Sequence, residues 1–215
     1  MTMTEQQNRL FREWREDRPG MVTDGVVDES AYLNSKIRIL YLLKEVNGGM
    51  DWDLCQFVAS GGRAQTWDNI TRWTYGIRNL EQDIRWEALS RISEEQRKEV
   101  LKSICVVNVK KLSGGHTSNL KQIHGAARQD SQRLKAQLSI YHPDLIICCG
   151  TDGVYFNEIY QYQPEWKMTS RGIWYVKETD RIVISYSHPE ARVRDCLLYY
   201  GLVDAVREIL CTKTE

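Results

Sequence analysis

The feature that most constrains the fold is a series of short apolar runs separated by segments with helical spacing. Ile37–Leu43, Ile104–Val109 and Leu145–Cys149 are almost wholly apolar, and each run is followed by a polar or Gly-containing segment. Such runs are typical of buried strands. Because strands that are buried on both sides alternate here with helices, the pattern predicts an α/β fold: a three-layer α/β/α arrangement around a mostly parallel sheet of about four strands.

Helical periodicity and start signals place the other elements. Ser93 and Gln96 form a capping box that opens a helix extending to about Leu101. Other helices are predicted over Thr4–Arg15, Trp67–Tyr75, Asp130–Tyr141 and Asp195–Leu210. Two late strands, Ile173–Lys177 and Arg181–Ser185, are joined by a short polar turn. No linker or repeat interrupts this series, so we expect one domain over residues 1–215.

Composition narrows the class of protein. The chain has no apolar run of the roughly 18 residues that a membrane span needs, and residues 1–18 are polar and charged, so we expect a cytoplasmic monomer without a membrane partner. The six cysteines form no CxxC pair, and Cys105, Cys148 and Cys149 lie inside apolar runs. Buried, reduced thiols are therefore expected, and no metal or other cofactor.

The charge balance bears on possible partners. The 29 Lys and Arg residues equal the 29 Asp and Glu residues, so the net charge is +0. A protein that holds nucleic acid by overall charge is basic. Any binding of DNA must then come from a local basic rim around a pocket.

Polar residues follow three of the predicted strands. Glu45 and Asn47 come after the first strand, Asn108 ends the second, and His188 follows the strand Arg181–Ser185. Ligands of open α/β sheets bind beyond the carboxyl ends of the strands. We therefore expect an acid, two amides and a histidine at one edge of the sheet.

The order of these motifs resembles the uracil-DNA glycosylase superfamily. The similar features are a strand that ends in a Glu/Asn/Gly loop, a strand that ends in Asn108 before Val109-Lys110, and a late strand that leads into His188-Pro189. The strand Leu145–Gly150 also looks like that family's strand ending in Gly. The resemblance covers roughly Ile37 to Arg192 and implies a uracil-DNA glycosylase-like domain that acts on DNA.

The resemblance implies a role for each of these residues. The first loop would place the attacking water; Glu45 is the better base, because the amide of Asn47 can orient water but cannot take its proton. A register shift of a residue or more leaves Asp51 as a further candidate. Asn108 would read the edge of the flipped base, and His188 would donate a hydrogen bond to the base oxygen as negative charge develops.

Other residues would surround the base. Phe57, or else Trp52 or Trp67, could stack on it. Gly48 and Gly49 follow the first motif where classical uracil enzymes place a bulky aromatic residue, and the Pro usual in this loop is absent. If the glycines line the pocket, a modified pyrimidine would fit, such as glucosylated hydroxymethylcytosine of bacteriophage DNA.

Basic residues beside the motifs are candidates for phosphate contacts. Lys110, Lys111, Arg192 and Arg194 adjoin the predicted site, and a second basic stretch contains Lys121, His124, Arg128 and Arg133. Some relatives hold an iron–sulfur cluster with cysteines near the N-terminus, but no cysteine precedes Cys55 here. We therefore expect no cluster.

The function expected from the sequence is that of a monofunctional DNA glycosylase, in repair or in defence against phage. It would hydrolyse the N-glycosidic bond of a flipped-out pyrimidine and leave an abasic site. Lys44 adjoins the first motif, but it is not placed for the Schiff base of a lyase. Two alternatives stay open: a hydrolase of free nucleosides or nucleotides, and a base-recognition module of the same fold without activity.

Overall fold

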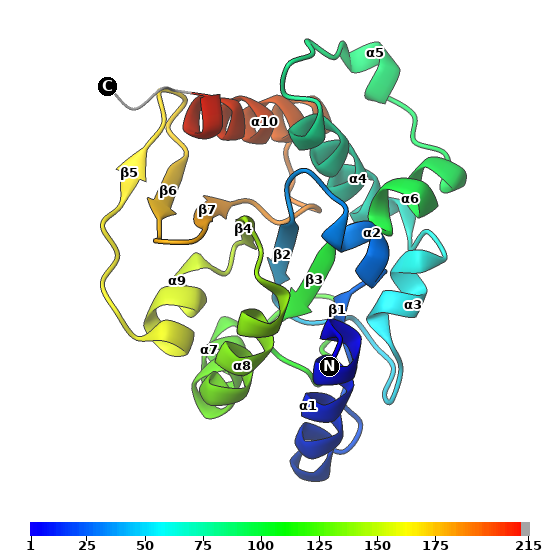
Figure 1. The fold of residues 1–215 in the computed structure, drawn as a ribbon, viewed down its shortest axis with the longest axis vertical. Coiled ribbons are helices and arrows are strands. Elements are labelled where there is room, and N and C mark those ends of the chain that lie inside the picture. The colour runs from blue at the N-terminus through cyan, green and yellow to red at the C-terminus, as the bar shows by residue number, and fades with distance from the viewer. Residues whose placement is uncertain (212–215) are drawn as a thin grey trace.

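A single sheet forms the centre of the molecule (Figure 1). The computed structural model describes residues 1–211, and in this part the sheet has seven strands in the order β1-β3-β2-β4-β7-β6-β5. The strands are β1 (Gly25–Val26), β2 (Ile39–Leu43), β3 (Cys105–Asn108), β4 (Leu145–Cys149), β5 (Lys167–Met168), β6 (Trp174–Lys177) and β7 (Ile182–Tyr186). The final residues of the predicted domain, 212–215, lie outside the described part.

The predicted parallel core is present, but the predicted number of strands is wrong. β3, β2, β4 and β7 are parallel neighbours, whereas β1, β6 and β5 are antiparallel additions at the two edges. The edge strands β1 and β5 have only two residues each, and β5 is exposed. Neither strand contains the apolar run by which the central strands could be predicted.

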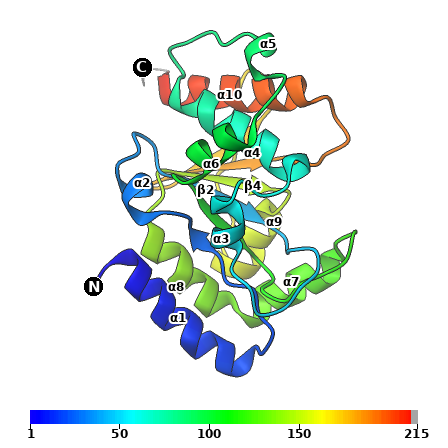
Figure 2. The same cartoon turned by 90° about the vertical axis from the view of Figure 1, so that its right-hand side faces the viewer.

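Helices cover both faces of the sheet and so form the outer layers (Figure 2). Successive residues of a strand point to opposite faces. In β2, Ile39 and Tyr41 accordingly pack into one apolar core, and Leu40 and Leu42 into the other. The first core is closed by α3 (Leu54–Ala59), α4 (Ala64–Arg78), α6 (Glu94–Leu101) and α10 (Asp195–Cys211), and the second by α1 (Met3–Asp17), α7 (Leu120–Gln129), α8 (Ser131–Tyr141), α9 (Asp152–Val154) and η1, a π-helical turn (Tyr155–Tyr160).

The predicted helices are all found, with ends shifted by a few residues. The capping box at Ser93 opens α6, and a second capping box, Thr2 with Glu5, opens α1. Several short elements have no predicted counterpart; among them are α2 (Glu29–Leu33), α3 and α5 (Trp86–Leu89). No helix in residues 1–211 is both long and apolar enough to cross a membrane.

The cysteines of the central strands are packing groups. Cys105, Cys148 and Cys149 are buried, as predicted, and burial raises the pKa of each of these thiols. Thiolate chemistry is thereby disfavoured inside the sheet.

Parallel pairing places the functional segments together. In register, Leu43 at the end of β2 lies beside Asn108 at the end of β3, and Cys149 at the end of β4 lies beside Tyr186 at the end of β7. The segments that follow these strands therefore leave the sheet at the same edge.

Candidate active site

A cavity of about 470 Å³ lies at this edge of the sheet. Seven of the residues predicted from the sequence line it: Glu45, Asn47, Gly48, Gly49, Phe57, Asn108 and His188. They come from three strand ends and from α3, so the parallel topology brings together residues that are up to 143 positions apart (188 − 45). A volume of this size suits a small organic ligand.

Asn108 has a buried side chain without hydrogen-bond partners. The residue is 2% exposed, and neither its amide nitrogen nor its amide oxygen bonds to any group in the described part of the chain. Of the buried polar side chains in residues 1–211 that have an unpaired atom, only Asn108 lines the cavity. Because a buried, unpaired amide costs about 1–3 kcal/mol, a ligand that offers both a donor and an acceptor would relieve the cost.

The Asn108 backbone is held by a buried polar network. Its N–H donates to Asp24 at 2.7 Å. The Asp24 carboxylate also accepts from Lys111 Nζ, at 2.7 and 2.9 Å, and from Gln137 at 2.7 Å. The unpaired amide therefore extends from a fixed point of the backbone.

Lys111 cannot make the predicted phosphate contact. Its side chain is 1% exposed, and the ammonium group lies 5.7 Å from the ring centre of Phe11 and 5.2 Å from that of Trp14. Burial lowers the pKa of Lys111, although its partner Asp24 opposes that shift. The expectation fails because Lys111 points into the core beneath α1, where its ammonium group pairs with Asp24.

Lys110 points the other way, toward the first loop. Its ammonium group forms an ion pair with Glu45 at 2.5 Å, with side-chain exposures of 15% and 4%. The ion pair therefore holds the Lys110 ammonium group against the first loop, where the sequence had predicted a phosphate contact. A Cβ placed on Gly114 would lie 2.2 Å from the Glu45 carboxyl carbon, so only glycine fits there without moving the carboxylate.

Asn47 is exposed and faces a histidine that the sequence analysis did not identify. The Asn47 amide nitrogen lies 3.4 Å from His116 Nδ1. The segment around His116 is paired with the first loop, because the Gly114 N–H donates to the Val46 carbonyl at 2.8 Å. The segment after β3 therefore supplies a partner to Glu45 and a partner to Asn47.

One wall of the cavity is made of glycine and aromatic residues. Gly48 and Gly49 have φ angles of 77° and 79°, which favour glycine, and a Cβ on Gly48 would meet no atom within 4 Å. Trp52 Nε1 donates to the Gly48 carbonyl at 3.3 Å. Of the stacking candidates, Phe57 is the most accessible at 37% exposure, whereas Trp67 is 4% exposed.

His188 also lines the cavity and is half-buried. Its Nδ1 accepts from the Glu190 N–H at 3.1 Å, so the neutral ring carries its proton on Nε2. Burial lowers the pKa of His188, with Glu190 acting against the shift and Lys44 adding to it. The site thus favours a neutral imidazole with an Nε2–H donor.

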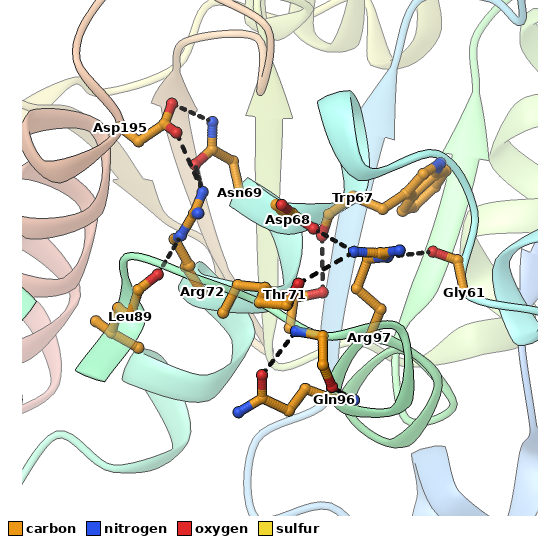
Figure 3. A network of polar contacts seen from close by, with 12 residues as sticks. Gly61, Trp67, Asp68, Asn69, Thr71, Arg72, Leu89, Gln96, Arg97 and Asp195 are labelled. Atoms are coloured by element: carbon orange, nitrogen blue, oxygen red, sulfur yellow. Dashed lines mark hydrogen bonds and ion pairs between the residues drawn. The ribbon is translucent and has the colours of Figure 1, made fainter. Parts of the chain in front are cut away.

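Two hydrogen-bond networks, each built around an arginine, join α4 to the segments beside the cavity (Figure 3). In one, Asn69 donates to the Pro189 carbonyl at 2.8 Å, while Arg72 bonds to Asn69 and Asp195. In the other, Arg97 of α6 donates to the Gly61 carbonyl at 2.9 Å and to Asp68 at 2.8 Å. These bonds fix the segments that precede α4 and that follow β7.

The remaining predicted cations divide into two groups. Arg192 and Arg194 are exposed in the segment between β7 and α10 and have no side-chain partner in residues 1–211. In the second basic stretch, by contrast, His124 and Arg128 both bond to Glu158, and Arg133 pairs with Asp17. That stretch therefore has fewer free cations than its sequence indicates.

Sequence reasoning missed His116, Arg63, Thr66, Ser118 and Glu190, all of which line the cavity. Glu190 directly follows the His-Pro motif, and His116 follows a Gly pair close to a strand end, so proximity to motifs was the available signal. Within residues 1–211, no group of three or more His, Cys, Asp or Glu side chains is arranged to hold a metal. Comparison with family models and with curated proteins finds no match for this chain.

Proposed function

We propose that the protein is a monofunctional DNA glycosylase that excises a flipped-out pyrimidine. The observation that carries this proposal is the unpaired, buried Asn108 amide in the cavity that Glu45, Asn47 and His188 also line. An amide with one free donor and one free acceptor matches the edge of a pyrimidine.

The residues suit hydrolysis of an N-glycosidic bond. Water attacks C1′ of the sugar, the bond from C1′ to the base nitrogen breaks, and its electron pair stays with the base. His188 Nε2–H would donate to the base oxygen on which negative charge develops, an interaction that strengthens in the transition state. Phe57 would stack on the base.

Glu45 and Asn47 would act together on the water. Glu45 takes the proton, because a carboxylate can accept one and an amide cannot, and Asn47 orients the water. The cation of Lys110 holds one Glu45 oxygen, which leaves the other for the water. Asp51, the further candidate of the first loop, lines a neighbouring groove and not this cavity.

The glycine wall favours a large base. Gly48, Gly49 and Gly115 line the cavity, and side chains at Gly48 or Gly115 would meet no atom within 4 Å. The cavity volume of about 470 Å³ leaves space beyond one pyrimidine ring. We therefore include modified pyrimidines, such as glucosylated hydroxymethylcytosine of phage DNA, among the proposed substrates, with uracil as the simplest.

The test measures abasic sites in oligonucleotides that contain uracil, hydroxymethylcytosine or glucosylated hydroxymethylcytosine. Wild type is compared with Glu45→Gln, Asn108→Ala and His188→Ala. We expect one substrate to be cleaved and each variant to lose about 100-fold or more in rate. Binding of DNA without cleavage of any substrate would instead indicate a base-recognition module.

A hydrolase of free nucleosides is the second candidate. The observation that favours it is that Lys110 and Lys111, two of the four predicted phosphate contacts, are engaged in ion pairs within the protein. A free nucleoside needs no phosphate contacts. Cleavage of the nucleoside at a rate equal to that of the oligonucleotide would favour this candidate.

A further inference from the structure

A second and larger cavity adjoins the candidate active site. It is an open groove of about 1120 Å³ between α1 and the segment Asp51–Phe57. Trp52 and Phe57 line both the groove and the active-site cavity, and their rings pack edge to face with centroids 5.8 Å apart. The groove thus adjoins the site where the base would lie, and the two rings form a shared wall.

Three arginines of α1 line the groove. Arg9, Arg12 and Arg15 recur every three residues, which keeps them on neighbouring positions of one helix face over about 9 Å of axis. Trp14 occupies the other face and packs into the core, and Phe11, at 4% exposure, packs into the core at the floor of the groove. All three arginines are exposed, and none of their side chains has an ion-pair or hydrogen-bond partner in the described part of the chain.

Three carboxylates also line the groove, and none of them forms an ion pair with the arginines in the described part of the chain. Glu5 accepts from the Thr2 N–H within the capping box of α1, and Asp53 accepts from the backbone N–H groups of Cys55 and Gln56 as the N-cap of α3. Asp51 is the remaining carboxylate that lines the groove. Two of the three carboxylates are thus held by backbone N–H groups, whereas the three guanidinium groups keep free donors for a ligand with several anionic groups.

We propose that this groove binds the phosphate backbone of the single-stranded DNA that flanks the target base. A row of cations beside aromatic rings is the usual means of holding a single strand, because cations follow the phosphates and rings stack on the bases. The strand would leave the active-site cavity past Trp52 and Phe57 and continue along Arg9, Arg12 and Arg15. This assignment rests on the proposed glycosylase function, and it makes α1 the main electrostatic contact of a chain with no net charge.

The first test is the salt dependence of binding to a fluorescent single strand of about 15 nucleotides. The variant carries Arg9→Gln, Arg12→Gln and Arg15→Gln, and its matched control carries Arg85→Gln, Arg91→Gln and Lys177→Gln, exposed residues that lie outside the groove. Each lost phosphate contact changes the slope of log affinity against log salt by about 0.7, so we expect the slope of the variant to be shallower by about 2. The control should keep the slope of the wild type.

A second variant excludes misfolding as the cause. Asp51→Asn removes the remaining carboxylate of the groove, and Asn tolerates the positive φ of 55° at this position. We expect it to bind the strand more tightly than wild type, which loss of structure could not produce. An unchanged slope in the triple variant would overturn the proposal, and so would a slope change seen with duplex DNA alone.

Excision assays separate this proposal from the proposed function. If the groove acts as we infer, the triple variant keeps its rate at saturating oligonucleotide and loses kcat/KM only. Wild-type protein that cleaves no base, but binds single strands through the arginines, would overturn the glycosylase function and leave the groove assignment intact. Excision with normal binding by the triple variant would overturn the groove assignment alone.

Discussion

The buried amide of Asn108 suits a ligand better than it suits the folded chain. Because its two polar atoms have no partner in residues 1–211, Asn108→Ala removes an unfavourable burial of about 1–3 kcal/mol. We expect the free energy of unfolding to stay equal or to rise, while excision falls about 100-fold or more. Urea denaturation together with abasic-site assays checks both parts.

Asn69 is the matched control for that substitution. It is also a buried asparagine, but its amide donates to the Pro189 carbonyl and to Asp195 and accepts from Arg72. Asn69→Ala should therefore lower the free energy of unfolding by about 1–3 kcal/mol. A comparable loss in Asn108→Ala would show that the Asn108 amide has a partner in the folded protein, against our interpretation of the site.

His188 should make stability depend on pH. Burial lowers its pKa below the ordinary value of 6.5, so the unfolded chain binds a proton more readily than the folded chain does. The contribution of His188 to the free energy of unfolding is therefore at its full value above about pH 6.5, and it decreases as the pH falls toward the pKa of the folded state. Denaturation of wild type and His188→Gln at roughly pH 7 and pH 5 should show a smaller loss in the variant. Equal losses would contradict the lowered pKa.

At the scale of elements, the segment after β3 determines the geometry of the first loop. Gly114→Ala would push a methyl group against the Glu45 carboxylate, at 2.2 Å from its carbon, and displace it. We expect excision to fall about 100-fold with little change in KM, because a shift of about 1 Å in a reacting group has effects of this size. Gly115→Ala is the control, since its Cβ would meet no atom within 4 Å. Similar kinetics in the two variants would exclude this role for Gly114.

How far the sequence predicts an element depends on where its contacts lie. The core strands β2, β3 and β4 were predictable because their apolar runs report burial directly, and the parallel sheet then follows. The helix α4 was predicted with shorter bounds than it has, and its role in holding the cavity walls was not predicted. That role comes from bonds such as Asn69 to Pro189, 120 positions apart, which no local pattern encodes.

In the candidate site, too, the features set by local sequence were predictable and those set by long-range contacts were not. Glu45, Asn108 and His188 were predictable because each lies at a strand end or within two residues after it, and parallel strands bring such positions to one edge. The roles of Lys110 and Lys111 were not predictable. The two residues are adjacent and carry the same charge, so they look equivalent in the sequence, but Lys110 pairs with Glu45 at the cavity and Lys111 with Asp24 in the core. Only the direction of each side chain distinguishes them.

At the scale of the whole molecule, one buried network joins α1 and α8 to the site. Gln137 of α8 donates to Asp24 and to Tyr141, and Tyr141 donates to Gln7 of α1. Asp24 in turn holds the backbone of Asn108. The helix that carries the arginines of the groove is thus connected through hydrogen bonds to the residue that would read the base.

The ion pair of Asp24 and Lys111 is the centre of that network and the most sensitive point of the fold. Both side chains are at most 1% exposed, so Lys111→Met would leave the Asp24 charge buried with no cation beside it. We expect a loss of about 3–5 kcal/mol in the free energy of unfolding, measured by urea denaturation. Lys36→Met, at an exposed position, should change it by no more than about 0.5 kcal/mol.

Adding Asp24→Asn to Lys111→Met identifies the cause of that loss. The second substitution removes the buried charge while the amide oxygen can still accept from Gln137, so the double variant should be more stable than Lys111→Met alone. If the double variant is instead the less stable of the two, the hydrogen bonds that the Asp24 carboxylate accepts from the Asn108 N–H and from Gln137 stabilise the fold by more than its buried charge costs. In that case these hydrogen bonds, rather than the ion pair with Lys111, would be the main means of positioning Asn108.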